Sequence, residues 1–371
     1  MAIPLFVASA CGQNTGGDPR MAQEAPVERG TCTVDMPAQW SEAIAASAVD
    51  TGDISTTPRA VSPSGEVVAV RDSGEERQLL LIGTDKSVRQ LFSMARPELF
   101  TIGYAGIDDR WILFAVVRHP RDANGVLPQT VRIDLIDRQV GSLRTVAEQS
   151  AADAAATPDR NVIDDVVLSE GKAYWITRDT YNGDSGVVHS FDPATGTQTD
   201  VAAGPISDLR TGSSWAPWTT ADLPAAVAAI PSVNKASVGT DGTAFGWIAD
   251  VAHGGDGIGY WSPQTGIVKV NGVDLHPDVT KFARVLVFDS FVIIGAGGMT
   301  STLGVSATIV DTRSGAVAEL TPRNPDQYDM VTASRGGTLA LNLWAGPGRG
   351  PKESDRAVGL VRAGALAPLH C

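Results

Sequence analysis

The sequence predicts an all-β protein, a six-bladed β-propeller with a short N-terminal helix, and three observations support this fold class. A turn that leads into a short apolar strand occurs six times along the chain. A hairpin turn with Asp or Ser first and Gly fifth occurs four times. Residues 54–371, divided among six units, give about 53 residues per unit, which suits a blade of four short strands.

The first repeat is a turn residue followed by a run of β-branched or aromatic residues, such as Val67–Val70 or Trp111–Phe114. Apolar runs bounded by Gly and Asp are typical of buried strands. The six turn residues are Gly65, Asp109, Gly171, Gly242, Asp289 and Gly337. Two sandwich domains are the alternative arrangement of the same strands.

The second repeat is a hairpin turn that leads into an alternating strand, such as Ile267–Val270. An Asp or Ser oxygen accepts N–H groups two or three residues further on, and Gly takes the positive φ without a steric penalty. The four copies are Asp137–Gly141, Asp192–Gly196, Ser262–Gly266 and Asp311–Gly315. Each copy therefore predicts the connection between the last two strands of a blade.

One short amphipathic helix is expected in residues 33–48, before the first blade. Pro37 suits a helix start, and Trp40, Ile44 and Ala48 share one helical face at spacings of four residues. We expect this face to pack on the main domain.

The N-terminus, residues 1–11, resembles a bacterial lipoprotein signal. An apolar stretch ends in Ala8, Ser9 and Ala10, directly before Cys11, whose thiol would accept the lipid. The apolar stretch is short and no Lys or Arg precedes it, which a start codon assigned too late would explain. A frayed terminus with a buried free cysteine is the alternative. Residues 12–31 are rich in Gly, Pro and polar residues and are expected to form a flexible linker, with the helical segment at 32–53 and the propeller at 54–371.

The repeat resembles that of the TolB and WD40-like periplasmic propellers, with the closest part at Ser62–Val70 followed by Leu80–Asp85. The Gly-His and Trp-Asp dipeptides of true WD40 blades are missing. Together with the N-terminus and the composition rich in Ala, Gly and Val, the chain is similar to secreted lipoproteins of actinobacteria. This resemblance implies a fold and an extracytoplasmic location, but no specific function.

Cys32 and Cys371 flank the predicted propeller. Because the first and last blades of a propeller are neighbours, we expect these two cysteines to form a disulfide that locks the ring. A disulfide requires an oxidising compartment, in agreement with export.

The net charge of −13 over 371 residues argues against a nucleic-acid partner, which requires a basic surface. No run of about 20 apolar residues occurs, so no membrane-spanning helix is expected. The five histidines show no zinc-ligand spacing, and no assembled catalytic group is recognised. We therefore expect no catalytic residue and no resident cofactor.

A metal in the central channel is the main alternative, since lactonase-like propeller hydrolases bind Ca²⁺ through carboxylates and amides there. Positions six to eight residues before the aligned turns supply Asp164, Asp165 and Asp329. Arg59, Lys235 and Lys281 come from equivalent positions and oppose a Ca²⁺ site. Solvated strand ends are the simpler interpretation.

Three aromatic residues are candidates for ligand contact. Trp215 and Trp218 lie in a long polar insertion, residues 211–235, and Tyr181 lies in a Gly- and Asp-containing loop. Exposed aromatics of this kind stack on sugar rings or anchor a protein partner, whereas packing over a blade edge is the alternative. The sequence thus favours a lipid-anchored, extracytoplasmic propeller that binds a protein or glycan partner, with a propeller hydrolase or a carbohydrate-binding propeller as alternatives.

Overall fold

The computed structural model describes residues 26–52, 55–73, 75–95, 100–118, 130–149, 162–179, 183–205, 223–230, 238–249, 257–275, 283–296, 307–320, 331–344 and 356–371. Cys11 and residues 12–25 of the predicted linker lie outside these ranges. Among the described helices none is long and apolar enough to cross a membrane.

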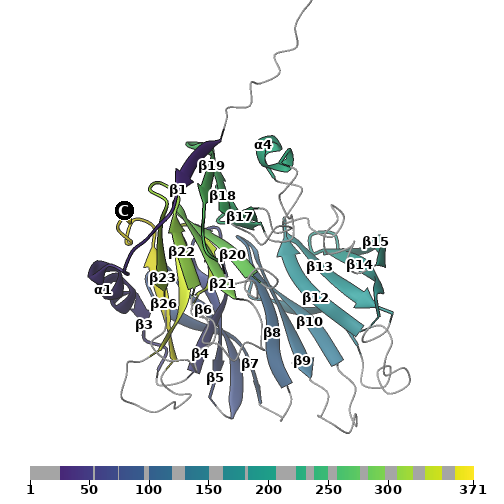
Figure 1. Cartoon of the computed structure of the whole chain (residues 1–371). Coiled ribbons are helices and arrows are strands. Elements are labelled where there is room, and N and C mark those ends of the chain that lie inside the picture. The colour runs from purple at the N-terminus through teal and green to yellow at the C-terminus, as the bar shows by residue number, and fades with distance from the viewer. Residues whose placement is uncertain are drawn as a thin grey trace, which may run out of the picture.

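Six antiparallel sheets of four main strands each follow one another around a centre, which confirms the six-bladed propeller (Figure 1). Blade 1 contains β4 (Ser55–Val61), β5 (Val67–Asp72), β6 (Glu76–Ile82) and β7 (Val88–Ala95). Blade 2 contains β8 (Phe100–Ile107), β9 (Trp111–Arg118), β10 (Thr130–Asp137) and β11 (Leu143–Glu148). Blade 3 contains β12 (Val162–Ser169), β13 (Lys172–Arg178), β14 (Ser185–Asp192) and β15 (Thr197–Pro205).

The second half of the ring repeats this pattern. Blade 4 contains β16 (Gly239–Thr240), β17 (Phe245–Ala249), β18 (Gly257–Ser262) and β19 (Gly266–Asn271). Blade 5 contains β20 (Ala283–Phe288), β21 (Phe291–Ala296), β22 (Ala307–Asp311) and β23 (Ala316–Leu320). Blade 6 contains β24 (Val331–Arg335), β25 (Thr338–Trp344) and β26 (Arg356–Arg362), and its fourth strand, β3 (Ala48–Val49), comes from the N-terminal segment.

The first strand of each blade lies innermost, since β4 contacts β8 and β24, β8 contacts β12, and β20 contacts β16 and β24. The second strands are buried on both faces between neighbouring blades; in β9, every residue from Trp111 to Val117 is buried. This explains why these strands are continuous apolar runs in the sequence. We call the side of the ring that carries the turns between first and second strands the turn face.

Hydrophobic clusters join neighbouring blades at five junctions of the ring. Examples are Val68 with Phe114 between blades 1 and 2, Leu113 with Trp175 between blades 2 and 3, and Ile248 with Val285 between blades 4 and 5. Among the described residues, blades 3 and 4 share no such cluster. The chain between these two blades contains a second short helix, α4 (Ala225–Ala228), in addition to the helix that the sequence predicts.

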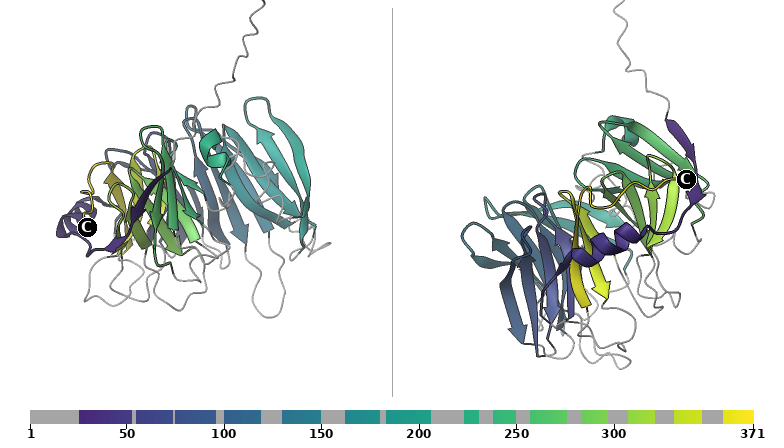
Figure 2. Two further views of the ribbon diagram at one scale, coloured as in Figure 1. Left: turned by 45° about the horizontal axis from the view of Figure 1, so that its top comes forward. Right: turned by 90° about the vertical axis from the view of Figure 1, so that its left-hand side faces the viewer.

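An N-terminal belt, Val27–Val49, crosses the outer edges of blades 4, 5 and 6 in this order (Figure 2). Strand β1 (Val27–Gly30) pairs in parallel with β19, and β2 (Cys32–Thr33) pairs in parallel with β23. Strand β3 pairs antiparallel with β26, so that blade 6 combines strands from both ends of the chain. The last residues of the predicted linker, 27–30, are therefore a strand, and the propeller uses residues well before residue 54.

The predicted helix is α1 (Ala38–Ala46), which begins after Pro37 as expected. Trp40 is fully buried and Ile44 packs against the same cluster, but Ala48 is exposed and belongs to β3. The amphipathic face is thus one turn shorter than the sequence predicts, because the chain leaves the helix to complete blade 6.

The Cys32–Cys371 disulfide is present, as the sequence predicts. It joins the belt to the C-terminal tail, residues 363–371, at the outer edge of blade 5, where Cys32 lies opposite Ala316. The tail is also held by Leu369, whose N–H donates to the buried Asp311 carboxylate at 2.9 Å. Ring closure therefore combines the mixed blade 6 with a covalent link between belt and tail.

A close contact across blade 4 gives a first testable prediction. A Cβ added at Gly259 would lie 2.0 Å from the indole of Trp247, which is buried and pairs with Gly259 across β17 and β18. We expect Gly259→Ala to lower the free energy of unfolding by about 1–3 kcal/mol because the indole must move within a packed site. Gly295→Ala in β21 is the matched control, since no atom lies within 4 Å of its added Cβ. Chemical denaturation of both variants measures the difference, and equal stabilities would contradict this packing.

Candidate functional site

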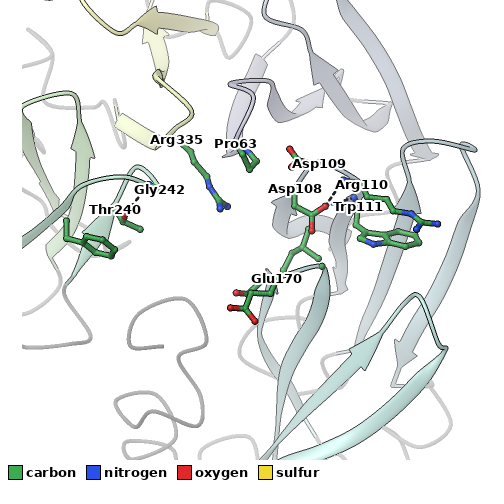
Figure 3. Close-up of a pocket in the computed structure, with 13 residues that line it drawn as sticks. Pro63, Asp108, Asp109, Arg110, Trp111, Glu170, Thr240, Gly242 and Arg335 are labelled. Atoms are coloured by element: carbon green, nitrogen blue, oxygen red, sulfur yellow. Dashed lines mark hydrogen bonds between the residues drawn. The ribbon is translucent and has the colours of Figure 1, made fainter. Parts of the chain in front are cut away.

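A cavity of about 570 Å³ lies on the turn face, at the centre of the ring (Figure 3). Turns from five of the six blades line it. The lining residues are Pro63 from blade 1, Asp108–Trp111 from blade 2, Leu168–Gly171 from blade 3, Thr240, Gly242 and Phe245 from blade 4, and Arg335 from blade 6. We call this cavity the channel mouth.

The turns that line the channel mouth are held by their own side chains. Asp108 Oδ1 accepts the backbone N–H groups of Arg110 at 2.8 Å and Trp111 at 2.6 Å. In blade 4, Asp241 Oδ1 accepts those of Thr243 at 2.8 Å and Ala244 at 2.9 Å. Aspartate is favoured at such positions because its short side chain reaches the N–H groups two and three residues on. The wall of the channel mouth is therefore made of ordered turns.

Most arginines of the turn face take part in contacts within the protein. Arg110 points away from the channel mouth, forms an ion pair with Asp137 at 3.1 Å and lies over the Trp111 ring. Burial acts to raise the pKa of Asp137, but the Gln139 N–H and the Arg110 guanidinium together hold it below its usual value. Arg138 pairs with Glu66 and thereby joins blades 1 and 2.

Arg362 has the equivalent role between blades 6 and 1. It donates to the Thr84 carbonyl at 2.8 Å and to the Thr338 hydroxyl. These contacts fix the neighbouring turns relative to one another. The turns around the channel mouth are therefore held together by residues that do not point into it.

Arg335 differs from these arginines. Its side chain is exposed and projects into the channel mouth, where it forms no hydrogen bond or ion pair with any residue that the structure describes (Figure 3). Its position is fixed at the backbone, because the Gly336 N–H donates to the Asp241 carbonyl at 3.4 Å and so ties this turn to blade 4. A guanidinium without a partner in a cavity is available to an anionic group of a ligand.

The acidic residues of the channel mouth come from blades 2 and 3. Asp109 and Glu170 are exposed and form no ion pair within the described part of the chain. Asp108 Oδ2 is buried and accepts no hydrogen bond in this part of the chain. Burial, and then the negative charges of Glu170 and Asp192, raise the pKa of Tyr174 on the same blade. The wall formed by blades 2 and 3 therefore contains the carboxylates of Asp108, Asp109 and Glu170.

Apolar side chains complete the channel mouth. Phe245 and Leu168 line it from blades 4 and 3, and Phe245 contacts Trp261 with ring centroids 5.9 Å apart. A concave site with apolar walls and a few charged groups is the usual form of a small-molecule site. The channel mouth can thus bind a ligand through both charge and apolar contact.

Most of the candidate site residues from the sequence fall outside the described residues. This holds for Trp215, Trp218, Tyr181, Asp329 and Cys11. Asp164 lies in β12, but its side chain is outside the description. Asp165 is a half-buried residue with φ 44° at a β-bulge of β12, and it does not line the channel mouth.

No group of three or more potential metal ligands occurs among the described residues. The proposed Ca²⁺ set of Asp164, Asp165 and Asp329 therefore stays a prediction.

The sequence interpretation missed Asp108, Asp109, Glu170 and Arg335. The alignment of the six turns contains the signal, because each of these residues lies at an aligned turn residue or within two positions of one. The positions six to eight residues before the turns, which the sequence interpretation assigned to the channel mouth, lie along the first strands rather than at the turns.

Comparisons with known proteins give distant structural likenesses to β-propeller domains. The β-propeller domain of the Trilobed protease from Pyrococcus furiosus matches with a TM-score of 0.40 and 11% identity over 78% of this chain and 91% of that domain. Oligogalacturonate lyase from Vibrio parahaemolyticus matches with a TM-score of 0.35 and 8% identity over 84% of this chain and 78% of the lyase.

Acylaminoacyl peptidase from Pyrococcus horikoshii matches with a TM-score of 0.35 and 9% identity over 78% of this chain, and the match spans 41% of the peptidase. No protein-family model and no curated protein sequence matches the chain.

Proposed function

We propose that this protein is an extracytoplasmic binding module that is anchored to the membrane by a lipid on Cys11 and takes a small ligand into the channel mouth. The observation that carries the proposal is the cavity of about 570 Å³ with Arg335 on one side and unpaired carboxylates on the other. Its volume is within the range of about 300–1,000 Å³ that is typical of ligand sites.

The side chains of Arg335, Asp109 and Glu170 support binding because, among the described residues, they form no ion pair that holds turns or blades together. Arg138 and Arg362 join neighbouring blades, whereas Arg335 and Glu170 form no contact of this kind among the described residues. Exposed charged groups that face a cavity can pair with the opposite charge of a ligand, and such charge complementarity favours specific binding.

Two features support the location and the anchor. The Cys32–Cys371 disulfide is typical of proteins in an oxidising compartment. Ala8, Ser9 and Ala10 before Cys11 resemble the cleavage site of a lipoprotein signal, and the repeat resembles that of TolB and WD40-like secreted propellers. On this proposal the residues between Cys11 and Val27 are the tether.

Ligand binding at the channel mouth is tested by a thermal-shift screen of the full chain with four classes of small probe: amino acids and short peptides, sugar acids, dicarboxylic acids and polyamines. We expect at least one class to raise the melting temperature, and Arg335→Ala or Glu170→Ala to abolish the shift. Arg89→Ala is the control, because Arg89 is an exposed arginine on the outer strand β7. Absence of any shift, or a shift that both cavity variants retain, would overturn the proposal.

The anchor is tested by expressing the protein in a bacterium that processes lipoproteins. We expect mass spectrometry of the membrane fraction to show a diacylglyceryl group on Cys11, and Cys11→Ser to release the protein from that fraction. Cys371→Ser, which removes the disulfide instead, is the control for loss of a different cysteine and should leave the lipid in place. An unmodified Cys11 in the native protein contradicts the anchor.

A further inference from the structure

Charges of opposite sign lie on opposite sides of the channel mouth. Arg335 enters from blade 6 beside Gly242, whereas Asp108, Asp109 and Glu170 belong to blades 2 and 3 (Figure 3). No ion pair joins the two sides within the described part of the chain. We infer that the ligand of the channel mouth is a short zwitterionic peptide, whose carboxylate binds Arg335 and whose ammonium group binds the side of Asp109 and Glu170. This inference rests on the proposed function as a binding module.

A ligand with charge of one sign fits the channel mouth poorly. A simple anion that pairs with Arg335 also faces three carboxylates, whereas a simple cation that pairs with these carboxylates also faces the guanidinium. Like charges brought together in a cavity cost free energy, and complementary pairs suppress wrong ligands for this reason. A molecule with a carboxylate at one end and an ammonium group at the other satisfies both sides.

The acidic side is fixed by the geometry of its own turn. Glu170 and Gly171 form a two-residue loop between β12 and β13 with φ values of 48° and 73°, and a type I′ hairpin turn requires positive φ at both positions. This turn places the Glu170 carboxylate at the channel mouth. Asp108 uses Oδ1 for its turn and its Oδ2 is buried, so the exposed carboxylates of Asp109 and Glu170 are the acceptors that an ammonium or peptide N–H group can reach.

The size and the apolar wall of the channel mouth favour a short peptide over a single small ion. The cavity of about 570 Å³ is far larger than the roughly 30 Å³ that one water molecule occupies, so a single small ion would leave most of it filled with solvent. Phe245 and Leu168 offer an apolar contact between the two charged sides. An aromatic side chain in the middle of a tripeptide suits this arrangement.

The test uses isothermal titration of the full chain with the tripeptide Ala-Phe-Ala and three blocked forms: N-acetylated, C-amidated and blocked at both ends. We expect the free tripeptide to bind, and each block to weaken binding about tenfold or more, because each removes one charge-assisted contact. Arg335→Gln should weaken the binding of the free tripeptide by a similar factor but leave the affinity for the C-amidated form unchanged. Glu170→Gln should weaken the binding of the free tripeptide and leave the affinity for the N-acetylated form unchanged.

The outcomes separate this inference from the proposed function. Equal affinity for the free and the blocked peptides overturns the inference. Binding of glucuronate or succinate that Arg335→Gln abolishes, with no binding of the tripeptide, also overturns it but leaves the proposed binding function intact. If none of these probes binds and the broader screen is empty, both proposals fail.

Discussion

Replacement of both Cys32 and Cys371 by serine is expected to lower the free energy of unfolding by up to about 5 kcal/mol. The disulfide spans 339 residues of sequence, and the chain-entropy model gives its largest effects for such long loops. The native contacts of belt and tail remain possible without the bond, so the loss arises mainly from the freedom that the unfolded chain regains. The melting temperature should therefore fall by up to about 7 °C.

The measurement compares denaturant midpoints of the oxidised protein, the reduced protein and the double serine variant. Reduction and substitution should give the same shift, since both remove only the covalent link. Cys11→Ser is the control for the loss of a thiol outside the ring. An unchanged midpoint on reduction would show that the mixed blade 6 closes the ring without help from the disulfide.

Trp40→Ala is expected to lower the free energy of unfolding by about 3–5 kcal/mol, because it creates a large cavity between α1 and blade 5. Trp40 is fully buried, meets the Phe291 ring edge-on with centroids 5.3 Å apart, and donates from Nε1 to the Ala367 carbonyl at 2.9 Å. The substitution thus removes contacts with both the propeller and the C-terminal tail.

Trp40→Phe is the matched control, because it keeps an aromatic ring but loses the hydrogen bond to the Ala367 carbonyl. We expect it to cost less than half as much as Trp40→Ala. Chemical denaturation of both variants tests this order. A decrease of less than about 1 kcal/mol in the free energy of unfolding of Trp40→Ala would contradict the packing of the helix on the tail. Replacement of a buried tryptophan by alanine normally destabilises a protein by more than this.

The two predictions are coupled, since Trp40 and the disulfide hold the same tail. Leu366 and Leu369 pack in the cluster that contains Trp40, and Cys371 follows two residues after Leu369. The stability effects of substitutions at two sites that share a partner are not additive in general. The loss in a variant lacking both the tryptophan and the disulfide should therefore differ from the sum of the separate losses.

The blades could be predicted because their signals are local. Asp311 and Gly315 lie four residues apart, and their turn is specified by a side-chain oxygen and a positive φ within that short stretch. The disulfide could also be predicted from the sequence, because a closed ring of blades brings both ends of the chain together. Its position on blade 5 could not be predicted, because that position depends on the path of the belt.

The belt gave almost no sequence signal. Strands β2 and β3 have two residues each, and Cys32 pairs with Ala316, far away in sequence. Such short strands have no detectable alternation and are specified by their distant partners. The channel mouth could not be predicted for the same reason. Whether an arginine is available to a ligand depends on long-range contacts such as that of Arg138 with Glu66, which are 72 residues apart in the sequence.

The parallel pairing of β1 determines from which side the preceding chain arrives. Val27 lies opposite Val268 and Gly30 opposite Asn271, while β19 starts at the hairpin Ser262–Gly266. Val27 is therefore the end of β1 nearer to that hairpin, and this hairpin is on the same side of the ring as the channel mouth. With the proposed lipid on Cys11, the 16 residues up to Val27 span at most about 58 Å. The opening would then be held within that distance of the bilayer, on the side of the ring from which the tether leaves.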